Sequence, residues 1–172
     1  MNGIRRLAVV VAVLFAGVSS ADVVKELFPW FEIGETVDAA KVREARLRKR
    51  DDPAPREGVA LRHLQSVKAK AGLRAYEEYL IVDAGMPTND MAWVTLSVPD
   101  RKVLQMRRDI GCGTIAAAGK LDKELRAKFK PLKFEGGAKL LEIMKVVDAS
   151  VSVQLSDADF GKELNAWLKK ME

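Results

Sequence analysis

Cysteine and histidine are almost absent from the chain. Its 172 residues contain one cysteine, Cys112, and one histidine, His63. A single cysteine excludes a disulfide framework within the chain. The two residues together are too few for a structural zinc site, which takes four Cys or His ligands. We therefore expect no metal site, and a fold that depends on its apolar core.

Motifs for nucleotide binding and serine chemistry are missing as well. No Gly-x-Ser-x-Gly turn occurs. Residues 113–120 resemble a phosphate-binding loop, but five residues separate the two glycines, and Leu121 stands where Ser or Thr would hold magnesium. Residues 111–116 match the loose dinucleotide pattern, but residues 106–110 before them look too charged for the buried strand that this motif must follow. The sequence therefore predicts no cofactor.

The composition is that of one globular domain. Hydrophobic residues make up 48% of the chain and charged residues 31%, which excludes a disordered protein. A length of 172 residues is typical of one domain and short for two. The formal net charge is +5, and part of that charge lies in the first residues.

The first 21 residues have the three parts of a secretory signal peptide. Arg5 and Arg6 give a positive start, residues 7–18 form an uncharged apolar run, and residues 19–21 are the small residues of a cleavage site. The run is shorter than the roughly 20 residues of a spanning helix, so we expect cleavage after Ala21 and no transmembrane anchor afterwards. Cleavage would leave 27 of the 29 basic residues against 24 acidic ones, a net charge of +3. The expected location is secreted or periplasmic, which argues against a nucleic-acid partner.

Proline and charge patterns divide the rest of the chain into three parts. Residues 22–50 are expected to form an N-terminal helical segment, residues 51–55 (Asp-Asp-Pro-Ala-Pro) a linker, and residues 56–172 an α+β domain. We expect residues 56–172 to fold without residues 22–50. The alternative is that the large apolar side chains of the N-terminal segment belong to the core: Leu27, Phe28, Trp30 and Phe31.

Apolar spacing predicts helices and strands in residues 56–172. Strand patterns occur at 76–82, 91–98, 145–147 and 150–155. Helical spacing occurs at 60–71, where Gly72 would be the C-cap, and at 99–110, 114–130 and about 140–144. Clean alternation is typical of an antiparallel sheet with one wet face. The predicted fold class is α+β, a two-layer domain with a small antiparallel sheet packed against helices.

The last helix is expected to begin after Ser156 and Asp157, which are good N-cap residues. Its apolar stripe contains Phe160, Leu164, Trp167, Leu168 and Met171. Because the connection from the preceding strand is short, we expect this helix to cover the sheet face that carries Val151 and Val153. Trp167 would then be a core residue.

Two stretches of the chain match at an offset of 57 residues. Residues 92–100 and residues 149–157 both read as an alternating strand followed by a helix start. One interpretation is a duplicated helix–strand–strand–helix unit. The other is that any two amphipathic strands before capped helices look alike.

A basic run near the N-terminus is the strongest local charge feature. The run consists of five residues: Arg43, Arg46, Arg48, Lys49 and Arg50. A helix over residues 38–50 would place Arg43, Arg46 and Arg50 on one face. This pattern predicts contact with an anionic partner, either a protein or a surface such as lipid headgroups or an anionic polymer. The alternative is a solvated helix face whose charge suits the negative helix end. No aromatic residues interleave with the run, as they would for single-stranded nucleic acid.

Cys112 and His63 are the remaining candidates for chemistry. A thiol nucleophile needs a nearby base, and His63 is the one histidine that could serve. We expect Cys112 to be a packed thiol, with a redox role or a catalytic role as alternatives. The predicted function is therefore an exported, soluble, non-enzymatic binding or interaction module. Two alternatives stay open: a small exported hydrolase that uses Cys112 or His63, and a structural or inhibitory protein that docks through its N-terminal segment.

Overall fold

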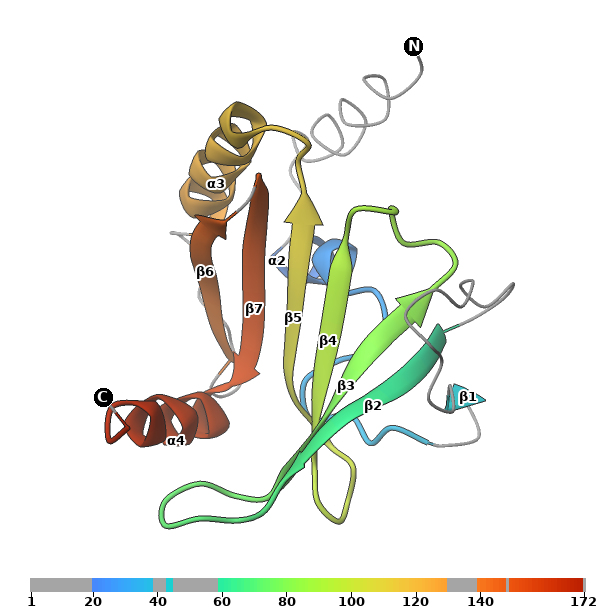
Figure 1. The fold of residues 1–172 in the computed structure, drawn as a ribbon, viewed down its shortest axis with the longest axis vertical. Helices are drawn as coiled ribbons and strands as arrows, with labels where there is room; N and C mark the ends of the chain where they lie inside the picture. Colours follow the sequence, from blue (N-terminus) through green and yellow to red (C-terminus); the bar gives the residue numbers. More distant parts are fainter. Residues whose placement is uncertain (1–19, 39–42, 45–58, 130–138, 148, 172) are drawn as a thin grey trace.

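A computed structural model describes residues 20–38, 43–44, 59–129, 139–147 and 149–171. Residues 1–19 of the expected signal peptide and the expected linker at 51–55 lie outside these ranges. The described chain is a mixed α+β fold (Figure 1). In chain order its elements are α2 (Ser20–Leu27), β1 (Arg43–Glu44), β2 (Val59–Val67), β3 (Tyr76–Asp83), β4 (Met91–Ser97), β5 (Val103–Gly111), α3 (Ile115–Phe129), β6 (Lys139–Val147), β7 (Ser150–Asp157) and α4 (Ala158–Leu168).

Six strands form an open antiparallel sheet, in the order β2-β3-β4-β5-β7-β6. The two-residue strand β1 adds to the β2 edge in parallel. The chain leaves β5, passes through α3 and returns as the edge strand β6, and β7 then fills the gap between them (Figure 1). None of the described helices is both long and apolar enough to cross a membrane.

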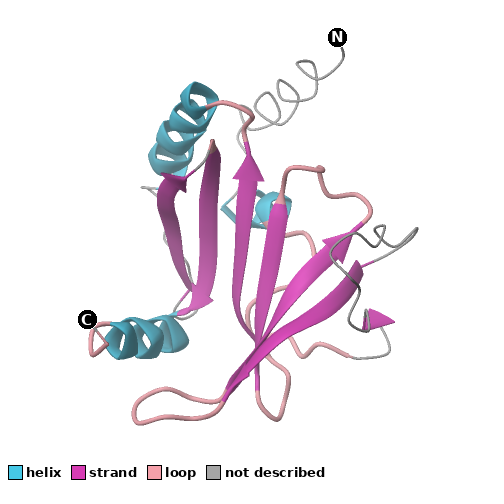
Figure 2. Ribbon diagram, viewed as in Figure 1, coloured by secondary structure: helices cyan, strands magenta, loops and turns pink. Residues whose placement is uncertain are grey.

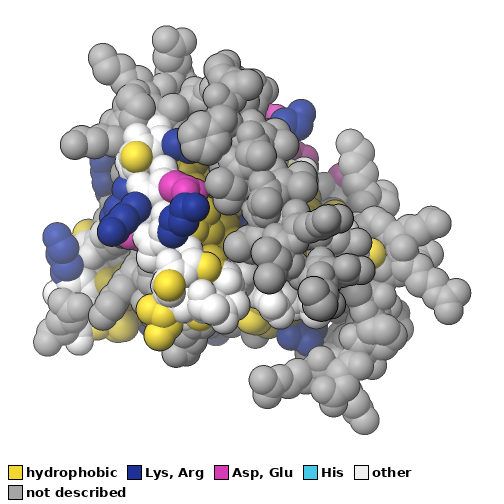
Figure 3. All heavy atoms as spheres, turned by 90° about the horizontal axis from the view of Figure 1, so that it is seen from above, with side chains coloured by type: hydrophobic (Ala, Val, Ile, Leu, Met, Phe, Trp, Pro, Cys, Tyr) yellow, Lys and Arg dark blue, Asp and Glu magenta, His cyan; other side chains and the backbone are white. Residues whose placement is uncertain are grey.

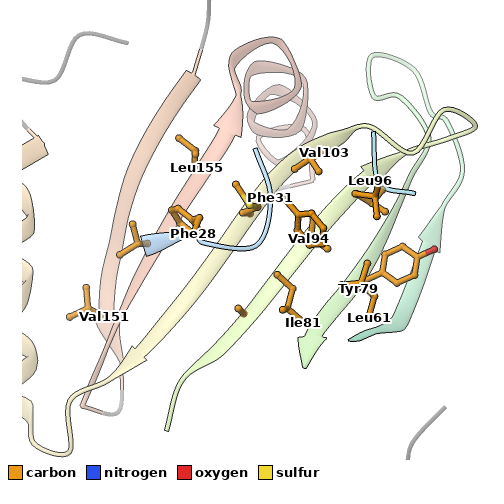
Figure 4. Packing of buried hydrophobic residues seen from close by; sticks show 14 of the residues in the cluster. Phe28, Phe31, Leu61, Tyr79, Ile81, Val94, Leu96, Val103, Val151 and Leu155 are labelled. Atoms are coloured by element: carbon orange, nitrogen blue, oxygen red, sulfur yellow. The ribbon is translucent and has the colours of Figure 1, made fainter. Parts of the chain in front are cut away.

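One face of the sheet carries the core. Paired positions run straight across it, from Tyr79 to Val94, Met106 and Leu155. Because side chains alternate along a strand, the other core residues of β3, β4 and β7 share this face: Ile81, Ala92, Leu96, Val151 and Val153. Figure 4 shows the labelled strand residues among them, such as Ile81, Leu96 and Val151, on the same side of the strands as Phe28 and Phe31.

The N-terminal segment covers this core face. The segment begins with α2 (Ser20–Leu27), and Pro29 stands just beyond its end. In Figure 1, α2 and the chain after it pass behind the sheet. Phe28, Phe31 and Val37 are buried in the same cluster as the strands, together with Ala118 and Leu125 of α3. The segment is therefore part of the core, which favours the alternative in which residues 56–172 do not fold without it.

Helix α4 packs on the opposite face of the sheet, at one end. Its N-cap is Asp157, whose carboxylate accepts a hydrogen bond from the Phe160 backbone N–H at 3.0 Å. Phe160 is fully buried in a second cluster, against Leu73 and Leu104. The expectation that this helix covers Val151 and Val153 is wrong, because both belong to the first cluster. Trp167 is half-buried and packs on the second cluster, so Phe160 is the core aromatic residue of α4.

Three segments expected to be helices are strands: residues 60–71 overlap β2, residues 99–110 overlap β5, and residues 140–144 lie in β6, whose last residues, 145–147, were expected to be a strand. Each of these strands has an extra residue relative to its neighbour, a β-bulge. In β5 the bulge lies at Leu104 and places Val103 and Met106, three residues apart, on the same face. A spacing of three looks helical, which explains the error. Gly72 is not a helix cap but lies at φ 83° in the β2–β3 turn.

The strands expected at 76–82, 91–98 and 150–155 are present as β3, β4 and β7, and the helix at 114–130 as α3. The duplicated unit does not have support from the fold. The second copy has the order helix, strand, strand, helix, but the first copy consists of strands β2 to β5 (Figure 2). The match between residues 92–100 and 149–157 therefore reflects two central amphipathic strands, β4 and β7.

Phe28→Ala tests whether the N-terminal segment belongs to the core. Phe28 is 2% exposed, so the substitution is expected to lower the free energy of unfolding by about 3–5 kcal/mol, the usual range for a buried aromatic. Ile115 is 77% exposed, so Ile115→Ala should change it by no more than about 0.5 kcal/mol. Urea unfolding measures both. Equal small effects would show that residues 56–172 are stable without this segment.

Candidate functional site

Of the five basic residues in the predicted run, Arg43 is the one that the structure describes. Arg43 lies in β1, a strand, where a helix over residues 38–50 was expected. Arg43 pairs with Ala60 of β2, so β1 is the edge strand on that side of the sheet. The other four basic residues lie outside the described residues: Arg46, Arg48, Lys49 and Arg50. An anionic partner for this run stays a prediction.

Cys112 lies just after β5 and is half-buried. Its Sγ donates to the Ile110 carbonyl oxygen at 3.5 Å. Burial raises the pKa of the Cys112 thiol, and the negative charge of Asp90 raises it further. Both effects disfavour the thiolate, which is the nucleophilic form of cysteine. The environment therefore makes Cys112 a poor nucleophile at neutral pH.

His63 and Cys112 do not form a dyad. His63 lies on β2, and strands β3 and β4 separate β2 from β5, the strand that ends at Cys112. Three strand spacings amount to about 14 Å, and Cys112 lies further still, beyond the end of β5. This distance is far beyond hydrogen-bond reach, so His63 cannot be the base for this thiol.

His63 instead belongs to a small exposed cluster that the sequence analysis missed. Its Nε2 lies 2.9 Å from Ser66 Oγ, and Ser66 Oγ donates to Glu77 Oε1 at 3.5 Å. The Tyr79 hydroxyl donates to Glu77 Oε2 at 2.6 Å. In a catalytic triad the carboxylate orients the imidazole, whereas here the carboxylate contacts hydroxyl groups. These contacts form a polar cluster at the surface. They do not have the order of a nucleophile, a base and an orienting carboxylate.

The glycine motif at residues 111–116 does lie between a strand and a helix, β5 and α3, which corrects the expectation that residues 106–110 are not a strand. The structure gives Gly111 another role. A Cβ at Gly111 would approach the Asn89 backbone oxygen to 2.5 Å, so only glycine fits there. The Gly111 N–H donates to Asp90 Oδ1 at 3.0 Å and is not free for a phosphate. Both neighbours of β5 are antiparallel to it, unlike the parallel strands of a dinucleotide fold.

The face of the sheet opposite the core carries two groups of hydrogen-bonded polar side chains. We call it the open face, and it consists of alternate residues of three central strands: Trp93, Thr95, Gln105, Arg107, Asp109, Ser152, Gln154 and Ser156. Their backbone register aligns them in rows, with Trp93 opposite Arg107 and Arg107 opposite Gln154. In Figure 2 no described helix lies across the middle of this face, and α4 reaches only its end.

Arg107 is the centre of the open face. Its guanidinium carbon lies 4.3 Å from the Trp93 ring centroid, a cation–π distance. Arg107 also donates to Asp109, from Nε at 3.3 Å and from Nη2 at 3.2 Å. The Ser152 hydroxyl donates to the same carboxylate. These contacts hold the guanidinium in one place while 39% of the Arg107 side chain is exposed.

A second row of hydrogen bonds lies beside the first. Gln105 Nε2 donates to Ser156 Oγ at 2.9 Å, and Gln154 Nε2 contacts the same oxygen at 3.3 Å. Thr95 and Ser156 are buried, whereas Gln105 and Gln154 are half-exposed. Amide and hydroxyl side chains can donate and accept, so this surface can adapt to varied polar groups. The arrangement suits the binding of a polar surface.

The sequence signal for the open face was incomplete. The alternation of residues 91–98 correctly placed Trp93 and Thr95 opposite the apolar side chains of β4. Arg107 and Asp109 were missed because residues 99–110 were expected to be a helix. Within the described part of the chain, no group of three His, Cys, Asp or Glu side chains could hold a metal ion.

Comparison with protein-family models, with curated proteins and with solved structures gives no match for this chain. The structural argument for function therefore depends on the geometry of its own surfaces.

The reactivity of Cys112 separates a packed thiol from a catalytic one. Because its pKa is raised, the native thiol should hold less thiolate at neutral pH than the same residue in the unfolded chain. We expect iodoacetamide to alkylate native Cys112 more slowly than urea-unfolded Cys112, with the rate rising at a higher pH in the native protein. Faster alkylation of the native thiol would favour the hydrolase alternative.

Proposed function

We propose that the chain is an exported, non-enzymatic interaction module that binds a protein partner through the open face. The observation that carries this proposal is the Trp93–Arg107 stack at the centre of a sheet face whose middle none of the described helices crosses. Residues at the centre of protein interfaces are enriched in Trp and Arg, and these residues dominate binding energy there. Arg107 is already ordered by Asp109, so less side-chain entropy is lost when a partner binds.

Lysine is depleted from the cores of protein interfaces, and it is missing from the open face. The chain has 16 lysines, yet none of the eight residues that define this face is one of them. Elsewhere lysine is common, and the end of the molecule near α3 shows Lys and Arg side chains with acidic ones between them (Figure 3). The composition of the open face therefore differs from that of the solvated surface of the same protein.

The exported location is part of the same proposal. Its support is the signal-peptide pattern of residues 1–21, of which only Ser20 and Ala21 are described, at the start of α2. The alternative of docking through the N-terminal segment has less support, because Phe28, Phe31 and Val37 are buried in the core. The hydrolase alternative has one observation in its favour, the 2.9 Å contact between His63 and Ser66.

Site-specific photo-cross-linking in the exported fraction tests the proposal. A photoreactive residue in place of Gln154 should give a cross-linked product, and one in place of the exposed Lys123 on α3 should not. Arg107→Ala should weaken the interaction by about 2 kcal/mol or more, roughly thirtyfold in affinity, as at other interface centres.

Arg126→Ala is the matched control, because Arg126 is also an exposed arginine that pairs with an aspartate, Asp122 at 2.9 Å. It should leave the cross-link unchanged. Equal cross-linking from positions 154 and 123, or an unchanged product with Arg107→Ala, would contradict an interface on the open face.

A further inference from the structure

The end of α4 has apolar side chains that the fold leaves exposed. Leu168 is 44% exposed and Met171 is 63% exposed. Beside them Trp167 is half-buried, with the Lys70 Nζ atom 4.9 Å from its ring centroid. Lys70 lies in the β2–β3 loop, which runs below α4 at the same end of the molecule (Figure 1). Two segments distant in sequence thus meet around one aromatic ring.

Exposed lysines occur in the two segments that meet here. They lie in the β2–β3 loop, on α4 and just after it: Lys68, Lys70, Lys162, Lys169 and Lys170. The acidic side chains of α4 have basic partners, since Glu163 pairs with Arg74 at 2.5 Å and Asp159 lies 3.7 Å from Lys162. The Arg74 guanidinium lowers the pKa of Glu163, so this ion pair persists in mildly acidic solution. The exposed apolar side chains thus have lysines next to them, Lys169 and Lys170 in the chain and Lys70 over the Trp167 ring.

We infer that this surface, which we call the α4 patch (Trp167, Leu168 and Met171 with the five lysines), docks on an anionic lipid bilayer. Trp has an apolar body and a polar N–H, which suits the headgroup region. Lysine keeps its charge in water while its methylene stem covers apolar surface. Exposed apolar side chains together with lysines are the combination that binds anionic membrane surfaces.

The composition of the α4 patch favours a membrane over a protein partner. Lysine is depleted at protein interfaces, and exposed lysines next to exposed apolar side chains are the opposite of the open face. Each lysine near an anionic surface increases the binding affinity roughly fivefold, so the lysines provide the electrostatic attraction to the membrane. Leu168 and Met171 supply the part that enters the bilayer. This inference does not depend on the open face, and either can fail without the other.

Co-sedimentation with lipid vesicles tests the inference. The full chain is mixed with vesicles of phosphatidylcholine alone and with vesicles that also contain phosphatidylglycerol. Because residues 7–18 are themselves apolar, the measured quantity is the gain in affinity that phosphatidylglycerol brings, compared among variants. We expect a gain that falls as salt is added.

Two double variants remove the two parts of the surface separately. Lys169→Glu with Lys170→Glu should reduce the phosphatidylglycerol-dependent gain roughly tenfold or more. Leu168→Ser with Met171→Ser should also reduce it several-fold. All four side chains are exposed, so both variants should melt close to the parent, which circular dichroism checks.

Matched controls lie on other surfaces. Lys120→Glu with Lys123→Glu changes two lysines of α3, and Val98→Ser with Ile115→Ser changes two other exposed apolar residues. Both control variants should show the same phosphatidylglycerol-dependent gain in affinity as the parent protein. The inference is overturned if phosphatidylglycerol brings no gain, if the controls lose it equally, or if only the lysine variant reduces it. That last result would mean that the surface binds anions without entering a bilayer.

Discussion

The buried ion pair between Asp90 and Arg108 is the interaction that joins the separate parts of this fold. Arg108 lies on the core face of β5, opposite Ala92 and Val153, where a charge is costly without partners. Asp90 Oδ2 accepts from Arg108 Nη2 at 2.7 Å and from Nε at 3.0 Å. The same guanidinium donates from Nη1 to the Leu27 carbonyl oxygen at the end of α2, at 3.0 Å. One arginine thus connects the sheet, the loop before β4 and the N-terminal helix.

The two surfaces proposed to bind partners depend on this arrangement. Because α2 and the residues after it cover one face of the sheet, strand alternation places Arg107 on the opposite face, next to Arg108 in the chain. Asp90 also accepts from the Gly111 N–H, which fixes the end of β5, and its negative charge adds to the effect of burial in raising the pKa of the Cys112 thiol. At the other end of the open face, Phe160 anchors α4 in its own cluster. The open face and the α4 patch are therefore consequences of how the core is closed.

Local pattern predicted the elements whose spacing is regular, and it failed where a bulge breaks the spacing. Strands β3, β4 and β7 alternate without an extra residue, and α3 and α4 have complete stripes, so all five were expected from the sequence. Strands β2, β5 and β6 each have a bulge and were expected to be helices, apart from residues 145–147 at the end of β6, which were expected to be a strand. Asp90 and Arg108 could not be paired from sequence, because a whole strand lies between them in the chain. Two of the eight residues of the open face, Trp93 and Thr95, lie in β4, whose alternation was expected, and joining them to the residues of β5 and β7 required the strand register.

A double-mutant cycle on Asp90→Ala and Arg108→Ala tests this account most directly. The Asp90 side chain is 3% exposed and that of Arg108 is 14% exposed, so each single substitution leaves an uncompensated buried charge and should lower the free energy of unfolding by about 3–5 kcal/mol. The double variant should lose less than the two single losses together, with a coupling of about 1–3 kcal/mol. Additive losses, within about 0.5 kcal/mol, would contradict the claim that this pair joins the N-terminal segment to the sheet.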